Sequence, residues 1–435
     1  MENSRAERFD APLTVAIVGA GKRARAYANE ALRRPGWLKV TAVADPHPDR
    51  CAALADAHGV SPDYRFASHL DLAARPGLVD AIINTTGDAH HFETALPLIR
   101  AGYPMLLEKP IALCEAHVRQ LIAAAREHGR PVMICHSMRY RTFYQKVREL
   151  LLAGSIGQLR SVYASENVSY HHLATTFIRN PRYAGVVPTP MLMQKCCHDM
   201  DAIAWLVGAP ALRVASFMTP TQFVPENAPA GSTERCLDGC AVENDCPYSA
   251  RKLYVENHAW DAYPWSDFSD AIVPSDERKL EALKTDSPYG RCVWRCAHTA
   301  VDHQNVAIEF SNGVTATFDM FCATARGYRA LRLVGTTGGI VGDADAGWIK
   351  LRRMSPGPDR MHVEEEIDVT EPTEGHRGGD RRMLEDFVAV VRGEPGARGL
   401  TRIEDSLTGH QIVFAADVAQ REKRIVEIDA PLYPL

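Results

Sequence analysis

Short apolar runs alternate with helical stretches over roughly the first 135 residues of the chain. Residues 13–18, 38–44 and 79–83 are short and apolar, so each predicts a buried strand. Two further apolar runs, at residues 104–107 and 131–135, complete the series. Strands that alternate with helices indicate βαβ units. We therefore expect a parallel sheet with helices covering both faces.

The pattern changes after residue 136. An Asn-Gly pair at Asn312-Gly313 separates two apolar runs, which is a strong local signal for a β-hairpin. The segment of about 217–300 is rich in Pro, Asp, Cys and Trp and has little periodicity, so we interpret it as an insertion. The other elements predicted here are helices at 143–152, 201–207, 383–391 and about 404–421, and strands at 159–165, 306–310, 314–318 and 329–334.

These patterns predict an α/β protein of two domains. Residues 1–136 form a doubly wound parallel sheet of the Rossmann type, and residues 137–435 form a second domain that carries the Cys-rich insertion. A length of 435 residues is too great for one ordinary domain and agrees with this division.

Charge and composition exclude several classes of protein. The formal net charge of -5 is not that of a general nucleic-acid binder, and no stretch approaches the ~20 apolar residues needed to cross a bilayer. The first twelve residues are polar and contain no secretory signal, so the expected compartment is the cytoplasm. Eleven cysteines in such a chain favour reduced thiols or metal ligands over a disulfide framework.

A glycine turn follows the first predicted strand. The sequence Gly19-x-Gly21-x-x-Ala24 has the dinucleotide-binding spacing with alanine in the third position. The first glycine makes the bend, the second lets the backbone approach a pyrophosphate, and the small third residue brings helix and strand close together. The phosphates then meet the positive end of the helix dipole.

An acidic residue closes the second predicted strand. Asp45 follows Ala24 by 21 residues and can accept hydrogen bonds from the ribose hydroxyls. Its charge would repel a 2′-phosphate, so NAD is favoured over NADP. Lys22, Arg23 and Arg25 leave NADP as the alternative, because a cationic side chain can pair with that phosphate.

With Glu108-Lys109-Pro110 after the fourth apolar run, the chain resembles the Gfo/Idh/MocA oxidoreductase family (glucose–fructose oxidoreductase, inositol dehydrogenase and relatives). The matching pieces stand in the family's order over most of residues 13–210 and 300–420. They are the glycine turn, Asp45, Thr86 with His91, the Glu-Lys-Pro sequence, His198-x-x-Asp201 and the segment Leu333-Val334-Gly335-Thr336-x-Gly338.

The resemblance implies a fold, a cofactor and a substrate class. It implies a C-terminal α/β domain with an open, mainly antiparallel sheet that often serves for oligomerisation, and hence a homo-oligomer. The substrate implied is a small carbohydrate-like molecule. The residues implied in cofactor binding, besides the glycine turn and Asp45, are Thr85, Thr86, His91, Glu108 and Lys109.

Oxidation of a secondary alcohol requires a proton acceptor and a group that stabilises the developing alkoxide. His198 is the candidate acid/base, since its unperturbed pKa is close to neutral pH. Lys109 lies at the end of a central strand, where either burial lowers its pKa or it donates a hydrogen bond to the substrate. Many family members carry an aspartate where this chain has Gln194, and Lys195 is the candidate replacement.

Polar residues near these positions are candidates for substrate contacts. Asp201 shares a helix face with His198, and Arg139 and Tyr140 follow the last predicted Rossmann strand. The full set of predicted substrate contacts is Arg139, Tyr140, His171, His172, Arg179, Gln194 and Asp201, with Asn180 beside them.

Five cysteines fall in the insertion: Cys236, Cys240, Cys246, Cys292 and Cys296. Thiolates at such separations can fold a poorly cored loop around a metal, so we expect a structural site for zinc, with an iron–sulfur cluster as the alternative. His298 is a spare ligand.

The sequence leads to an NAD-dependent dehydrogenase acting on a secondary hydroxyl of a sugar, cyclitol or sugar derivative. Two alternatives stay open. One is a glycosidase or lyase that retains NAD and oxidises its substrate transiently, which the change at Gln194 supports. The other is a catalytically silent nucleotide-binding protein, against which the presence of both Lys109 and His198 argues.

Overall fold

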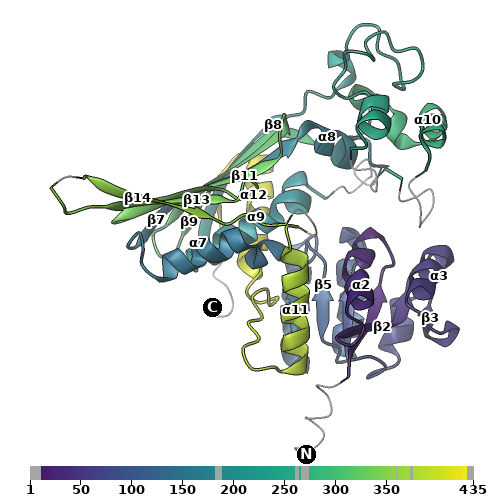
Figure 1. The fold of residues 1–435 in the computed structure, drawn as a ribbon, viewed down its shortest axis with the longest axis horizontal. Coiled ribbons are helices and arrows are strands. Elements are labelled where there is room, and N and C mark those ends of the chain that lie inside the picture. Colours follow the sequence, from purple (N-terminus) through teal and green to yellow (C-terminus); the bar gives the residue numbers. More distant parts are fainter. Residues whose placement is uncertain are drawn as a thin grey trace, which may run out of the picture.

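The computed structural model describes residues 11–181, 189–259, 264–265, 274–358, 360–372 and 376–428. The chain forms an N-terminal domain, a broad sheet domain, and an irregular region that rises from one end of the sheet above the first domain (Figure 1).

The N-terminal domain is a parallel sheet of six strands in the order β3-β2-β1-β4-β5-β6. The strands that form its centre are almost wholly buried, which explains their unbroken apolar runs. This is the doubly wound order, in which ligands bind at the carboxyl ends of the strands. The strands are β1 (Leu13–Val18), β2 (Leu38–Ala44), β3 (Arg65–Phe66), β4 (Ala81–Asn84), β5 (Met105–Leu107) and β6 (Val132–Ile134).

Helices cover both faces of this sheet. One face packs against α5 (His91–Arg100) and α6 (Glu115–His128), and the other against α2 (Lys22–Arg33) and α11 (Gly379–Arg392). Helix α11 comes from the C-terminal part of the chain, so the polypeptide returns to complete the first domain's core (Figure 1). Helices α3 (Pro48–Ala57) and α4 (His69–Ala73) complete the layer.

The second domain is built on nine strands in the order β14-β13-β12-β11-β7-β10-β9-β8-β15. Only β7 and β10 pair in parallel, so the sheet is mixed and mainly antiparallel, as expected. Helices α7 (Thr142–Leu152), α9 (Met191–Val207) and α12 (Leu407–Glu422) pack on one face. The strands are β7 (Leu159–Ser169), β8 (Ala211–Pro220), β9 (Val301–Phe310), β10 (Thr315–Thr324), β11 (Tyr328–Gly335), β12 (Gly338–Asp343), β13 (Trp348–Met354), β14 (His362–Asp368) and β15 (Val426–Glu427).

The predicted hairpin is present and longer than expected. Strands β9 and β10 join at Asn312-Gly313, where Gly313 has φ of +78°. Strands β12 to β14 were not predicted. Strand β14 is exposed and carries three successive glutamates, so it has no apolar pattern that would indicate a strand. Its side chains pair with Lys350, Arg352 and Arg353 across the ladder, so charge pairing takes the place of apolar alternation at this edge.

The irregular region lies between β8 and β9. Strand β8 runs on to Pro220, so the insertion begins a few residues later than predicted. Its described part contains α10 (Asp276–Lys284), a π-helical turn at Lys252–Glu256 and several short turns.

Candidate active site

The glycine turn after β1 fits a dinucleotide. Gly19 has φ of +84°, and a Cβ atom there would lie 2.8 Å from the backbone nitrogen of Thr86, so only glycine is accommodated. The described atoms leave the space beside Gly21 open to 4 Å. No side chain caps α2 and its first turn has no acidic residue, so the positive end of the helix dipole faces the position of a pyrophosphate without a competing carboxylate from that turn.

Asp45 lies at the end of β2, where it braces this turn. One carboxylate oxygen accepts from the backbone N–H of Ala20 at 2.7 Å, and the other accepts from that of His47 at 2.8 Å. The guanidinium of Arg50 lies 3.2 Å from the second oxygen. A negative charge is thus fixed beside the glycine turn.

Arg23 is paired with two carboxylates, so the structure does not support the role of pairing with a 2′-phosphate that was considered for it. Its Nε donates to Glu108 at 2.6 Å and its Nη1 donates to Asp380 at 3.0 Å. Tyr27 also donates to Glu108, at 2.8 Å. Burial alone would raise the pKa of Glu108, but Arg23 and Lys109 outweigh burial and hold this pKa below its ordinary value. Arg23 therefore ties the glycine turn to the Glu-Lys-Pro sequence and to α11.

The remaining residues predicted at the cofactor mostly support the edge of the sheet. Thr85 donates to the carbonyl of Gly19 at 2.6 Å, and Thr86 donates to Asn84 at 2.9 Å. The ring of His91 is fully buried between the carbonyl oxygens of Thr86 and Pro110, at 3.0 and 2.5 Å. On α2, Ala24 is buried, Arg25 is half-buried and Lys22 is exposed.

Lys109 reaches across the junction of the two domains. Its ammonium donates to the backbone carbonyl of Gln194 in α9 at 2.6 Å. Burial by itself would lower the pKa of Lys109, but Cys197, Asp88 and Glu108 outweigh burial and leave this pKa above its ordinary value. Of the two roles predicted for Lys109, the structure favours the hydrogen-bond donor, because the side chain stays protonated.

His198 lies one helical turn after Gln194, on the face of α9 that Lys109 contacts. It is buried, and its Nδ1 has no hydrogen-bond partner in the part of the chain that the structure describes. Burial lowers the pKa of His198, and the charge of Lys109 lowers it further, so this pKa lies well below its ordinary value. A neutral imidazole beside a protonated lysine can accept a proton from a bound hydroxyl.

The rings of His136 and His376 lie close to His198, and His410 packs against His136; neither His136 nor His410 was predicted from the sequence. The ring centroid of His136 lies 5.5 Å from those of His198 and His410, and that of His376 lies 6.0 Å from His198. His136 is fully buried, and neither ring nitrogen has a hydrogen-bond partner among the described residues, while its Nε2 lies 3.7 Å from the carboxylate of Asp201. The available signal was its position directly after β6, at the edge where parallel strands present their ligand-binding residues.

Asp201 and Arg139 pair with each other, so the substrate contacts predicted for them are not supported. Both carboxylate oxygens of Asp201 accept from Arg139 at 2.7 Å, and the two side chains are 0% and 2% exposed. Tyr140 is equally enclosed, donating to Asp386 at 2.6 Å. These residues fasten the last Rossmann strand to the second domain. Periodicity places His198 and Asp201 on one helix face but does not reveal what covers it.

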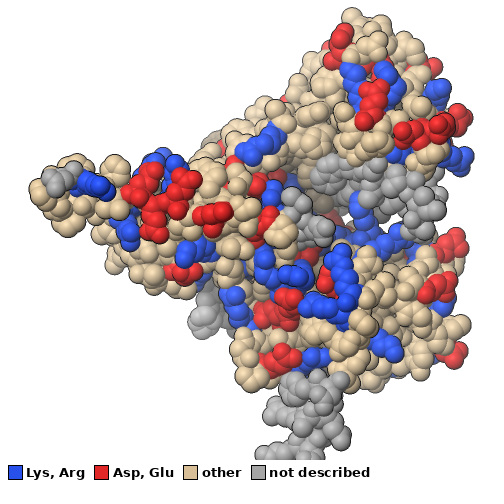
Figure 2. All heavy atoms as spheres, viewed as in Figure 1, with Lys and Arg blue, Asp and Glu red and all other residues tan. Residues whose placement is uncertain are grey.

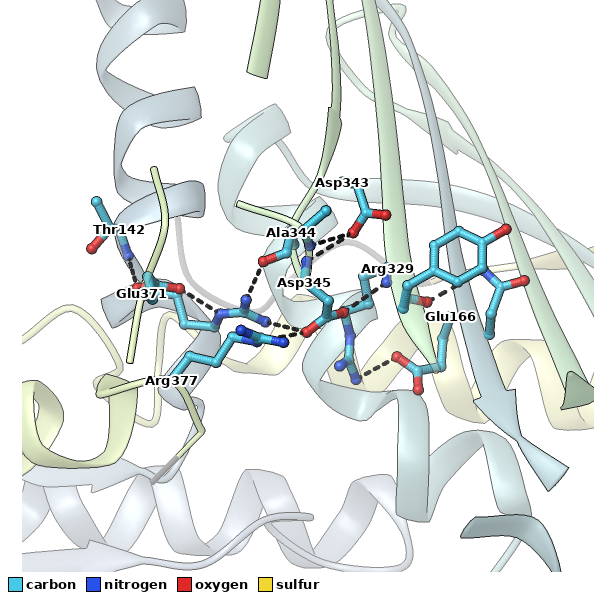
Figure 3. Close-up of polar contacts among 12 residues, drawn as sticks. Thr142, Glu166, Arg329, Asp343, Ala344, Asp345, Glu371 and Arg377 are labelled. Carbon is cyan, nitrogen blue, oxygen red and sulfur yellow. Dashed lines mark hydrogen bonds and ion pairs between the residues drawn. The ribbon is translucent and has the colours of Figure 1, made fainter. Parts of the chain in front are cut away.

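Lys195 belongs to a network of charges beneath α9. Its ammonium lies 3.1 Å from Glu166, and Glu166 lies 2.7 Å from Arg329, which donates to Asp199 at 2.8 Å. Figure 3 shows Arg329 between Glu166 and Asp345, with Arg377 and Glu371 continuing the network towards α7. The network holds the middle of α9 against the sheet.

The residues predicted after β7 divide into two groups. His171 and His172 are half-buried, and His171 lies 3.1 Å from the hydroxyl of Ser169. Arg179 is 2% exposed and Asn180 is 6% exposed. Arg179 donates to the carbonyls of Tyr248 and Arg291 in the insertion, so its predicted role at the substrate is not supported.

The cysteines of the insertion do not form the expected zinc site. Among the described residues, no group of three or more His, Cys, Asp or Glu side chains is arranged to hold a metal ion. One ring nitrogen of His298 lies 3.0 Å from the carbonyl of Phe223, so this histidine is not placed as a metal ligand.

In the described part of the chain, no helix is both long and apolar enough to span a bilayer.

Lys and Arg side chains gather on the visible face where the N-terminal domain meets the rest of the molecule (Figure 2). Positive charge on this face suits an anionic dinucleotide.

Comparison with known proteins agrees with this architecture. Residues 13–136 match the oxidoreductase family with an NAD-binding Rossmann fold, and residues 148–428 match that family's C-terminal alpha/beta domain. Inositol 2-dehydrogenase of Leifsonia xyli subsp. xyli is 26% identical over 206 residues, which are 46% of this chain and 56% of that protein. The chain thus matches little more than half the length of such relatives.

Solved structures share the fold at low sequence identity. An NAD binding oxidoreductase from Klebsiella pneumoniae superposes with a TM-score of 0.69 at 15% identity, covering 97% of this chain and 100% of the other. An aldose-aldose oxidoreductase from Caulobacter crescentus gives 0.63 at 16% identity, covering 96% and 100%. With both of its domains matched in order, the chain belongs to the Gfo/Idh/MocA oxidoreductase family.

Proposed function

We propose that the protein is an NAD-dependent oxidoreductase that acts on a secondary hydroxyl of a sugar, cyclitol or sugar derivative. The observation that carries the proposal is the neutral imidazole of His198 beside the protonated ammonium of Lys109, at the carboxyl edge of the parallel sheet. The inositol dehydrogenases among the relatives supply the substrate class.

The two side chains divide the work on the alcohol. Lys109 has three N–H donors, of which the carbonyl of Gln194 takes one, and it holds the substrate oxygen as negative charge develops there. His198 takes the hydroxyl proton through an unpartnered ring nitrogen. When NAD is bound, its nicotinamide supplies the hydride acceptor. The buried ring of His136 packs beside His198 and limits the access of water to it.

The choice of NAD over NADP rests on Asp45. Its carboxylate stands at the end of β2, where the ribose of a dinucleotide meets a Rossmann sheet, and it would repel a 2′-phosphate. Arg50 is already paired with this carboxylate.

Substrate contacts are assigned to side chains that remain partly accessible. We assign them to Gln194, Lys195, His171 and His172, which are half-buried and flank the position of His198 or follow β7. The cationic Lys195 suits a hydroxyl or a carboxylate of the substrate.

Self-association through the open face of the nine-stranded sheet completes the proposal. Helices cover one face, while the described strands expose large apolar side chains elsewhere: Tyr163, Leu212, Phe217, Phe321 and Val334. An apolar surface of this kind is typical of an interface.

A substrate panel tests the function directly. The protein is incubated with inositols, aldoses, sugar acids and glycosides in the presence of NAD or NADP, and NADH formation is followed by absorbance. We expect NADH with at least one polyol, and faster turnover with NAD than with NADP. Glycoside cleavage without net NADH would favour the NAD-retaining glycosidase or lyase instead. NAD binding with no turnover of any substrate would favour a silent nucleotide-binding protein.

A further inference from the structure

Four cysteines of the insertion surround one cavity. Cys236, Cys240, Cys246 and Cys292 line it together, although 56 residues of sequence separate the first from the last. The cavity has a volume of about 10 Å³, so the thiols surround a small space and do not meet at one point.

The shape of this cluster distinguishes a polynuclear group from a single ion. Zinc draws four sulfur atoms to about 2.3 Å from one centre, which leaves no hollow between them. The described side chains do not converge in that way. An iron–sulfur cluster lies between its four thiolate ligands, so their sulfur atoms surround a space. The four cysteines surround a space here as well.

The buried arginine beside the cavity points to a missing anion. Among the described residues, three arginines are buried: Arg139, Arg141 and Arg179. Arg139 pairs with Asp201, and Arg141 with Glu371 at 3.0 Å.

Arg179 has no such carboxylate within the described part of the chain. It donates to the carbonyl oxygens of Tyr248 and Arg291 and to the hydroxyl of Tyr254. Its remaining partner is the sulfur of Cys236, at 3.4 Å. A buried cation is costly unless a negative charge compensates it, and thiolates bound to a cluster supply that charge.

Aromatic rings shield the same cavity from solvent. Tyr248 and Trp294 line it and meet edge to face with ring centroids 5.5 Å apart, and Phe223 packs against both at 5.1 and 5.7 Å. Limited solvent access is one of the means by which proteins tune such clusters.

We propose that Cys236, Cys240, Cys246 and Cys292 bind a [4Fe–4S] cluster, which fastens the insertion between β8 and β9. The cluster closes a long segment with little regular structure around one centre. Cys296 is excluded from the ligand set, because it does not line the cavity and its thiol lies 3.3 Å from the carbonyl of Cys292.

Metal and sulfide analysis of the full-length protein, produced with added iron and purified without oxygen, tests the proposal. We expect about four iron and four acid-labile sulfide per chain, a broad visible absorption that dithionite bleaches, and an EPR signal in the reduced state. About one zinc per chain without sulfide, or less than about 0.3 metal per chain, would overturn the proposal.

Single substitutions identify the ligands. Cys236→Ala and Cys246→Ala should each lose most of the iron, while Cys296→Ser and the exposed Cys114→Ser should keep it. Affinity for NAD, measured by fluorescence, reports that each variant's first domain is folded. Where a ligand variant fails to fold, reconstitution of the wild-type apoprotein decides: uptake of iron with sulfide restores the absorption, and uptake of zinc alone contradicts the proposal. Neither readout depends on dehydrogenase activity, so the cluster and the proposed reaction are tested separately.

Discussion

The domain junction and the insertion differ in how they compensate buried positive charge. At the junction, Arg139 meets the carboxylate of Asp201, and Arg23 meets Glu108 and Asp380. In the insertion, the fully enclosed Arg179 meets carbonyl oxygens, a phenol and a sulfur atom. At the junction, carboxylates of the protein itself compensate the charges of these arginines. In our proposal, the thiolates of a bound cluster supply the charge that compensates Arg179.

The largest effect expected at the junction concerns the reaction itself. His198→Asn removes the proton acceptor and should lower kcat by about 10²–10⁴-fold, because general base catalysis contributes that much. Steady-state kinetics with the best substrate of the panel measures it. Affinity for NAD should not change, and iron content should stay that of the wild type. Full activity in this variant would remove His198 from the proposed mechanism.

Breaking a complete pair should cost stability. Asp201→Asn leaves the guanidinium of Arg139 buried without its counter-charge, and we expect a loss of about 3–5 kcal/mol in the free energy of unfolding. Urea unfolding followed by circular dichroism measures this loss. Asp417→Asn is the matched control, because Asp417 pairs with the exposed Arg421 on the surface of α12 and should leave the unfolding midpoint unchanged. Equal effects of the two variants would contradict the interpretation.

Acid should weaken the junction through Glu108 and Asp380. The pKa of each carboxyl lies below its ordinary value, because Arg23 and Lys109 outweigh burial at Glu108, and His376 and Arg23 outweigh burial at Asp380. A depressed folded-state pKa adds stability above the unfolded pKa of about 4, and this stability is lost as pH falls through the folded-state pKa. Glu108→Gln should therefore remove about 2 kcal/mol at pH 7 and less below pH 4.

Urea unfolding of the wild type and of Glu108→Gln at pH 7 and below pH 4 provides the test. The difference between the two proteins should shrink towards acid pH. A constant difference would mean that Glu108 contributes through packing and not through its charge.

The smallest effect should come from Arg179 in the protein without a cluster. Arg179→Met removes a buried charge that no carboxylate of the described residues compensates, so the apoprotein's stability should change little. In the loaded protein, loss of the contact to Cys236 should speed cluster removal by a chelator by about 10-fold. Visible absorption follows this release. The same rate in both proteins would separate Arg179 from the cluster.

Much of the fold follows from short-range patterns. The apolar runs predict the buried strands of the first domain, and the glycine turn is where β1 meets α2, because φ of +84° at Gly19 is a local requirement. The hairpin at Asn312-Gly313 is likewise determined by the residues of the turn itself. Strand β14 escaped prediction, since its stability comes from charges on the neighbouring strand and not from its own pattern.

The sequence by itself determined the dinucleotide turn, the alternation of strands and helices in the first domain and the identity of the two residues proposed for the reaction. The tertiary structure decided which side chains meet. It brought His136 to His198, turned Arg139 and Asp201 towards each other, returned α11 to the first domain and placed four distant cysteines around one cavity. The reason is physical: backbone geometry depends on neighbouring residues, whereas burial and charge pairing depend on contacts between segments far apart in the chain.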